Sequence, residues 1–210
     1  MSSLDRSGHT DGISALLSNP VIARLRDAVG AHHPVEVNEA GLRRAAVALI
    51  FRAGEEGRPE LLFIKRAEYP GDPWSGQVAF PGGREEQGDT SLVETAIRET
   101  REETGIDLAS DGKIIGTLDD LYPRTVRLPA IVVRPFVAVL DGGTSLTLSS
   151  EVALAFWIPF GSLTHNEAWR EDTVFARGIQ INARVFRHED HVIWGMTERI
   201  LAQLLQLVDS

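Results

Sequence analysis

The sequence has 210 residues, of which 43% are hydrophobic and 24% are charged, and it contains no cysteine. This composition is ordinary for a globular protein with one main domain, and it excludes disulfides, thiolate nucleophiles and cysteine-ligated zinc. The formal net charge is −9 without any cluster of Lys and Arg, which argues against nucleic acid as a partner. The sequence has no signal-like start and no apolar run near the roughly 18 residues of a membrane span, so we expect a cytoplasmic protein with no membrane partner.

The N-terminal residues predict a helical lead-in to a main domain. Residues 1–12 are polar, whereas residues 13–29 carry apolar side chains at helical spacing, with a break near Pro20. We therefore divide the chain into a helical segment, residues 1–40, and a main domain, residues 41–210.

The next segments predict a hairpin followed by a shaped loop. Residues 45–51 are apolar at every position, as expected for a strand that is buried on both faces. Residues 55–57 predict a turn and residues 61–64 a second strand, so the two strands can form a hairpin. Residues 69–83 are rich in Pro and Gly, which predicts an irregular, shaped loop.

A helix is predicted from about Ser91 to Thr104. Asp89, Thr90 and Ser91 are suitable N-cap residues, and Gly105 suits the position just past the helix end. The remaining predicted elements are strands over residues 114–118, 132–140, 154–158 and 179–186, a polar hairpin turn over residues 188–191, and a helix over residues 196–208. Many strands with few helices indicate an α/β or α+β domain.

Three carboxylates share one side of the predicted helix: Glu99, Glu102 and Glu103. They span an arc of about 100° on an α-helix, where like charges repel and destabilise the helix. A hard divalent cation removes this repulsion, and Mg²⁺ prefers carboxylate and water ligands while leaving room for phosphate oxygens. Arg98 lies at the edge of the stripe, placed to pair with one carboxylate. The alternative is an ordinary solvated charged face, but the glycines before and after the helix favour a metal site.

The segment resembles the Nudix box. That box has a glycine, a spacer, Arg-Glu, an apolar residue, any residue, Glu-Glu, any residue, a glycine and an apolar residue. The matching residues are Arg98, Glu99, Glu102, Glu103, Gly105 and Ile106. Thr100 replaces the usual aliphatic residue, Thr90 stands where a further glutamate is usual, and the spacer after Gly83 is one residue longer than the standard one.

In two of these departures the chain resembles a coenzyme A pyrophosphatase-like subgroup. That subgroup has the longer spacer and an aspartate at the position of Asp89. The subgroup also has an upstream signature of two leucines, an arginine followed by Ser or Ala, a second arginine, and Gly-x-x-x-Phe-Pro-Gly-Gly. The corresponding residues here are Leu61, Leu62, Arg66, Ala67 and residues 76–83, and Ile193–Thr197 is also similar. The second arginine is absent, and the longer segment of residues 69–75 stands in its place.

The resemblance implies an α/β/α sandwich with a mixed sheet, against which the box forms a loop, a helix and a loop. It implies attack of water on a phosphorus atom of a nucleoside diphosphate linked to another group X. The Gly83 carbonyl and the carboxylates of Glu99, Glu102 and Glu103 would hold one or more Mg²⁺ or Mn²⁺ ions. Such ions polarise the phosphoryl oxygen and lower the pKa of a bound water.

The general base has several candidates. In this fold it is either a box glutamate or a carboxylate from a distal loop. Glu151, just before an apolar strand, is the distal candidate, and Asp119 and Asp120 are further alternatives. An ordinary surface role is the competing interpretation of Glu151.

Substrate contacts are expected from arginines and one tryptophan. Arg66, Arg124 and Arg127 suit phosphate recognition because a guanidinium binds phosphate with two parallel hydrogen bonds, and an ordinary salt bridge is the alternative for each. Trp74 either stacks on a base or packs against the core.

These residues predict a hydrolase with a small nucleotide-type substrate. Coenzyme A or acyl-coenzyme A is the first choice, and ADP-ribose, nucleotide sugars and dinucleoside polyphosphates are alternatives. A different class is a Nudix-like sensor that binds a nucleotide without hydrolysis, which the loss of a metal carboxylate would favour. A third is an interaction domain with a coincidental acidic helix. Nudix relatives are often homodimers, and the N-terminal helix is a candidate interface.

Overall fold

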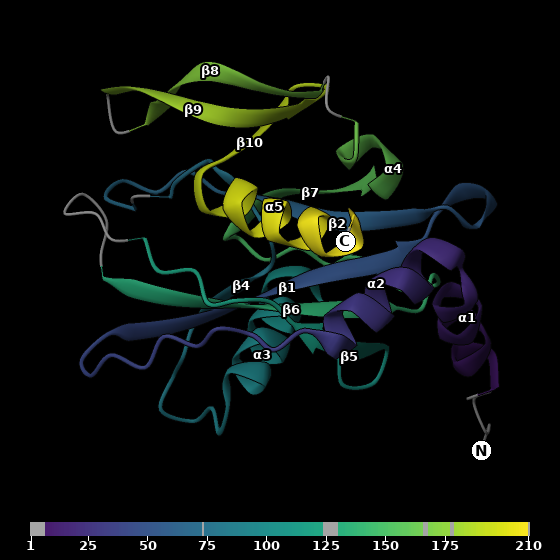
Figure 1. The fold of residues 1–210 in the computed structure, drawn as a ribbon. Helices are drawn as coiled ribbons and strands as arrows, with labels where there is room; N and C mark the ends of the chain where they lie inside the picture. The colour runs from purple at the N-terminus through teal and green to yellow at the C-terminus, as the bar shows by residue number, and fades with distance from the viewer. Residues whose placement is uncertain (1–6, 73, 124–129, 166–167, 177–178, 210) are drawn as a thin grey trace.

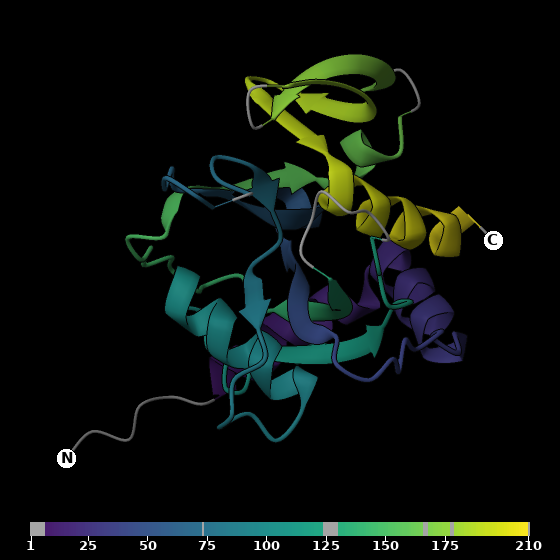
Figure 2. The same cartoon turned by 90° about the vertical axis from the view of Figure 1, so that its left-hand side faces the viewer.

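The computed structural model of the chain describes residues 7–72, 74–123, 130–165, 168–176 and 179–209. Figure 1 shows a large central sheet with helices on both sides, and a smaller sheet on one side of this body. Figure 2, turned by 90°, shows that the smaller sheet stands over the beginning of the C-terminal helix.

The large sheet is mixed and, within the described ranges, has seven strands. They are β1 (Arg43–Ala53), β2 (Pro59–Arg66), β3 (Val78–Ala79), β4 (Gly82–Arg84), β5 (Gly112–Thr117), β6 (Ile131–Leu140) and β7 (Val152–Pro159). The order is β3-β2-β1-β6-β5, while β4 pairs with β1 and β7 pairs with β2. Among the strand pairs of this sheet in the described residues, β1 and β6 are parallel and all the others are antiparallel. The predicted hairpin of the first two strands is confirmed.

The helices are α1 (Ser7–Ser18), α2 (Pro20–Ala31), α3 (Leu92–Thr104), α4 (Phe160–Leu163) and α5 (Gly195–Asp209), and a 3-10 turn, η1, covers Glu55–Gly57. The predicted break near Pro20 is confirmed, because Asn19 caps α2 and the proline occupies its first turn, where no backbone donor is needed. None of the helices in the described part of the chain is long and apolar enough to cross a membrane.

The smaller sheet is an antiparallel meander of β8 (Trp169–Ala176), β9 (Ile179–His188) and β10 (His191–Trp194). Its last strand leads directly into α5. The predicted polar turn over residues 188–191 is confirmed as the β9–β10 connection, in which His188 and His191 are register partners.

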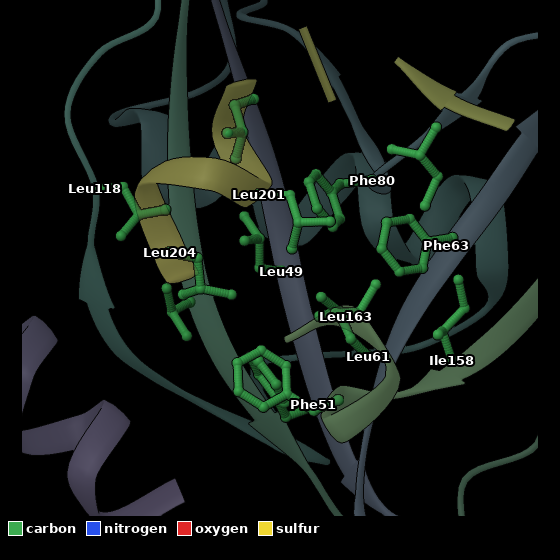
Figure 3. Close-up of a cluster of buried hydrophobic side chains, with 14 of the residues drawn as sticks. Leu49, Phe51, Leu61, Phe63, Phe80, Leu118, Ile158, Leu163, Leu201 and Leu204 are labelled. Carbon is green, nitrogen blue, oxygen red and sulfur yellow. The ribbon is translucent and has the colours of Figure 1, made fainter. Parts of the chain in front are cut away.

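The core lies on both faces of the large sheet because β1 is apolar at successive positions. Ala46, Ala48 and Ile50 face the side that α3 covers, whereas Leu49 and Phe51 face the opposite side. On that opposite side, Leu201 and Leu204 of α5 pack with the β1 and β2 side chains (Figure 3), together with apolar residues of α2. The arrangement is a sheet between two helical layers, which confirms the predicted α/β/α sandwich.

Candidate active site

The helix α3 presents the predicted glutamates between two well-defined ends. At its start the Ser91 hydroxyl accepts a hydrogen bond from the Glu94 amide, and at its end Gly105 takes a left-handed conformation with φ of 76°. Leu92 and Ala96 are buried against the sheet. This packing fixes the rotation of the helix and therefore decides which glutamates point toward the neighbouring strand β4.

The strand β4 lies so close to β1 that it needs glycine at position 82, and so close to α3 that a side chain at position 83 would force Glu99 to move. Gly82 and Gly83 pair with Val47 and Ala46 of β1. A side chain at Gly82 would collide with the Ala46 carbonyl, and one at Gly83 would collide with the Glu99 carboxylate. The two glycines therefore let the backbone lie directly beside the acidic face of α3.

Glu103 is a buried carboxylate with one hydrogen-bond donor and one nearby cation. Its side chain is 4% exposed. One oxygen, Oε2, accepts a hydrogen bond of 2.9 Å from the Gly82 amide, and the other, Oε1, lies 3.7 Å from Nη1 of Arg66. Burial, only partly offset by these partners, raises the pKa of Glu103 to about 7.

Glu99 and Glu102 differ from Glu103 in their surroundings. Glu99 is 17% exposed and Glu102 is 55% exposed. Both carboxylates meet the same nitrogen, Nη1 of Arg98, at 3.0 and 3.2 Å. Burial raises the pKa of Glu99 in spite of this cation.

Arg98 binds Asp89 more closely than it binds any glutamate. Its Nε and Nη2 donate to the two oxygens of Asp89 at 3.0 and 2.9 Å, and Nη2 also donates to the Arg84 carbonyl. This bidentate contact holds the pKa of Asp89 well below its usual range. The Arg98–Asp89 pair therefore ties the loop before α3 to the helix and fixes the guanidinium that Glu99 and Glu102 share.

Glu151 reaches the same region from the start of β7. The Ala67 amide donates to the Glu151 carbonyl at 2.8 Å, and the pairing of β2 with β7 shifts register between Lys65 and Arg66. Such irregularities redirect side chains at the end of a strand. The charge of Glu151 contributes to the raised pKa of both Glu99 and Glu103, so the three carboxylates form one electrostatic group.

These carboxylates line a cavity of about 690 Å³. Glu99, Glu103, Glu151 and Arg66 are part of its wall. The wall also includes apolar residues from the sheet, from the link between β3 and β4, and from α5: Val47, Val78, Phe80, Ile131, Met196 and Ile200. A cavity of this size suits a nucleotide-sized ligand that has a charged part and an apolar part.

The NUDIX domain family matches residues 41–177 of the chain. The chain belongs to the Nudix family. The mitochondrial coenzyme A diphosphatase NUDT8 of Homo sapiens is 32% identical over 168 residues, which cover 78% of this chain and 69% of that protein. The uncharacterized Nudix hydrolase NudL of Photorhabdus laumondii is 33% identical over 152 residues, 72% of this chain and 78% of its own.

A MutT/nudix family protein from Enterococcus faecalis has the same fold in its crystal structure. It superposes with a TM-score of 0.52 at 17% sequence identity, over 94% of this chain and 73% of that one. The predicted Nudix membership, near the coenzyme A pyrophosphatase-like subgroup, is therefore confirmed, and so are the Nudix fold and the pyrophosphohydrolase class.

The structure brings together only part of the predicted site. Arg66 and Trp74 both line the cavity, whereas Glu102 is not part of its described wall. Arg124 and Arg127 lie outside the described residues.

Asp119 and Asp120 are not in the described cavity wall; they hold the segment that follows α2. Asp119 accepts a hydrogen bond from the Val35 amide, and Asp120 accepts one from the Val37 amide. Neither aspartate is therefore placed to act as the general base of the Nudix site. No motif in the sequence points to Asp72, which contacts Arg66 and also lines the cavity.

The donor set of the Nudix box fits a hard cation. Over the described ranges, no three His, Asp or Glu side chains stand close enough together to form a ready-made metal site. Glu103 nevertheless keeps one oxygen, Oε1, that lies 3.7 Å from Nη1 of Arg66, and the half-buried Glu99 lies beside it. Carboxylate and carbonyl oxygens are the ligands that Mg²⁺ and Mn²⁺ prefer, so the residues are suited to such an ion.

Proposed function

We propose that this Nudix protein is a metal-dependent hydrolase that cleaves the diphosphate of coenzyme A or an acyl-coenzyme A. ADP-ribose, nucleotide sugars and dinucleoside polyphosphates are the alternative substrates. The observation that carries the proposal is the buried Glu103 beside Glu99 and Gly83 in a cavity of about 690 Å³. The similarity of the chain to a relative named coenzyme A diphosphatase supports the choice of substrate.

In this proposal, Glu99, Glu102, Glu103 and the Gly83 carbonyl hold Mg²⁺ or Mn²⁺. The ion, when bound, screens the charge of the diphosphate and lowers the pKa of a water molecule. Arg98 orients the Glu99 and Glu102 carboxylates, both of which it contacts.

Two further residues act on the substrate and on the attacking water. Arg66 meets a phosphate of the substrate, because its guanidinium lies in the cavity wall close to Glu103. Glu151, an exposed carboxylate in the same wall, accepts the proton of the attacking water.

The remaining wall suits the part of the substrate that is not a diphosphate. Val78, Met196 and Ile200 offer apolar contacts, which suit the long uncharged arm of coenzyme A. Trp74 packs against the main core, and its place in the cavity wall supports the proposal that it also stacks on the base of the substrate.

We also propose a role for the N-terminal segment, a cellular location and an oligomeric state. The segment of residues 1–40 is a helical lead-in, although Ile22 and Leu25 of α2 belong to the same core as the main domain. The cytoplasm is the compartment in which we expect the protein to act. A homodimer through the N-terminal helices is the oligomer we expect.

A substrate panel tests the proposed function. The purified chain with Mg²⁺ is given each candidate substrate, and products are separated and measured as phosphate released by a coupled phosphatase. Coenzyme A should yield 3′,5′-ADP, and Glu103→Gln should lower turnover by about a hundredfold or more. Glu55→Gln, a matched change at an exposed residue of η1, should leave turnover unchanged. Nucleotide binding without hydrolysis would instead support the sensor alternative.

A further inference from the structure

Asp72 is a rigidly held carboxylate in the segment of residues 69–75, which replaces the second arginine of the subgroup signature. Its side chain is 19% exposed. Oδ1 accepts a hydrogen bond of 3.0 Å from the Trp74 amide, and Oδ2 lies 3.1 Å from Nη2 of Arg66. The backbone is held as well, because the Asp72 amide donates to the Tyr69 carbonyl. Both carboxylate oxygens therefore have a fixed partner.

Arg66 lies between this carboxylate and the buried glutamate of the Nudix box. Nη2 is hydrogen bonded to Asp72, while Nη1 stays 3.7 Å from Oε1 of Glu103, beyond hydrogen-bond distance. The Arg66 amide donates to the Gln77 carbonyl at 3.0 Å, next to the register shift of β2. Arg66 is thus held at its backbone amide and at its guanidinium group.

Without the Asp72 charge, the nearest strong attraction for the Arg66 guanidinium is Glu103. Glu103 is 4% exposed, and the attraction between opposite charges grows as water is excluded. A guanidinium that closed on Glu103 would neutralise that carboxylate and would withdraw from the open cavity.

We propose that Asp72 is a positioning residue that holds Arg66 away from Glu103 and toward the diphosphate of the substrate. This inference rests on the proposed function. Two consequences follow from it: Glu103 stays available to a divalent cation, and the free side of the Arg66 guanidinium stays available to a phosphate. In this role Asp72 acts through Arg66 and not on the reacting atoms.

Asp72→Asn tests this inference, because asparagine keeps an oxygen for the Trp74 amide and loses the charge that holds Arg66. We expect KM to rise about tenfold with a smaller change in kcat. We also expect Mn²⁺, titrated by calorimetry without substrate, to bind about fivefold more weakly. In an Arg66→Gln background the same substitution should change neither quantity, since Asp72 acts through Arg66.

Glu68→Gln is the matched control, since Glu68 is an exposed carboxylate of the preceding residues and is absent from the described cavity wall. Equal KM and Mn²⁺ affinity in Asp72→Asn and the wild-type enzyme would overturn the inference while the proposed function stands. Equal losses in both backgrounds would also overturn it, because a general effect on the loop does not depend on Arg66. A wild-type protein that binds Mn²⁺ but cleaves no diphosphate refutes the proposed function, and the Mn²⁺ titrations then still decide the role of Asp72.

Discussion

Glu103→Gln should stabilise the metal-free protein at alkaline pH. Burial raises the pKa of Glu103 from 4.5 to about 7, so the folded state binds more protons than the unfolded state between these values. The contribution of Glu103 to stability is therefore complete below pH 4.5 and is lost as the pH rises through 7. At about 1.4 kcal/mol for each pKa unit, the ionised carboxylate costs the folded state about 3 kcal/mol above both values.

Glutamine removes this cost, since its side chain has nearly the same volume and keeps an oxygen for the Gly82 amide. We expect the free energy of unfolding of Glu103→Gln to exceed that of the wild type by about 3 kcal/mol near pH 8, and by less than about 1 kcal/mol near pH 5. Urea unfolding in EDTA, followed by circular dichroism, measures both values. Saturating Mn²⁺ should narrow the difference at pH 8, because an ion bound only by the folded wild type stabilises it. A variant that is less stable than the wild type at both pH values would refute this account of Glu103.

Three further substitutions test other parts of the site. Asp89→Asn should lower the free energy of unfolding by about 2 kcal/mol at neutral pH, since it breaks the bidentate contact with Arg98. Because Arg98 lowers the pKa of Asp89, the stabilising contact is lost as the pH falls below the usual aspartate range. The difference in free energy of unfolding between Asp89→Asn and the wild type, measured by urea titration, should therefore shrink at low pH. Gly83→Ala should lower kcat about a hundredfold in the substrate assay, because its side chain would displace the Glu99 carboxylate. Glu151→Gln should lower kcat about a hundredfold as expected for a general base, and should move the acid limb of the pH–rate profile to lower pH, since the charge of Glu151 raises the pKa of Glu99 and Glu103.

Most of the fold could be predicted because its elements carry strong local signals. The strand over residues 45–51 is apolar on both faces, and it forms the buried part of β1 at the centre of the sheet. The helix over residues 91–104 has a serine cap and a terminal glycine, and α3 has these ends. By contrast, β3 and β4 are two and three residues long and lie in a segment rich in Gly and Pro. These short strands exist because β2 and β1 offer them partners, which no local pattern reveals.

The sequence of β8 also fails to predict a strand, for a different reason. Arg170, Glu171 and Asp172 follow one another in it, and the chain there shows no clear apolar alternation. Its stability comes from pairing with β9, including the contact of Trp169 with the buried Phe186.

The site could be predicted in its chemistry but not in its detailed geometry. Spacing on a helix placed Glu99, Glu102 and Glu103 on one stripe, yet it could not show that Glu103 is buried and Glu102 exposed. That difference depends on how α3 packs on the sheet and on the approach of β4. The sequence predicted that Arg98 pairs with one carboxylate, whereas it shares its guanidinium among Asp89, Glu99 and Glu102.

The central claim is that the carboxylates of α3 hold a divalent ion at the diphosphate-binding cavity. Calorimetric titration of Mn²⁺ into the wild-type chain and into the double variant Glu99→Gln/Glu103→Gln, with and without nucleotide, measures this directly. We predict binding by the wild type that strengthens when nucleotide is present, and a loss of binding in the double variant. An absence of binding by the wild type under both conditions, or equal binding by the two proteins, would contradict the account.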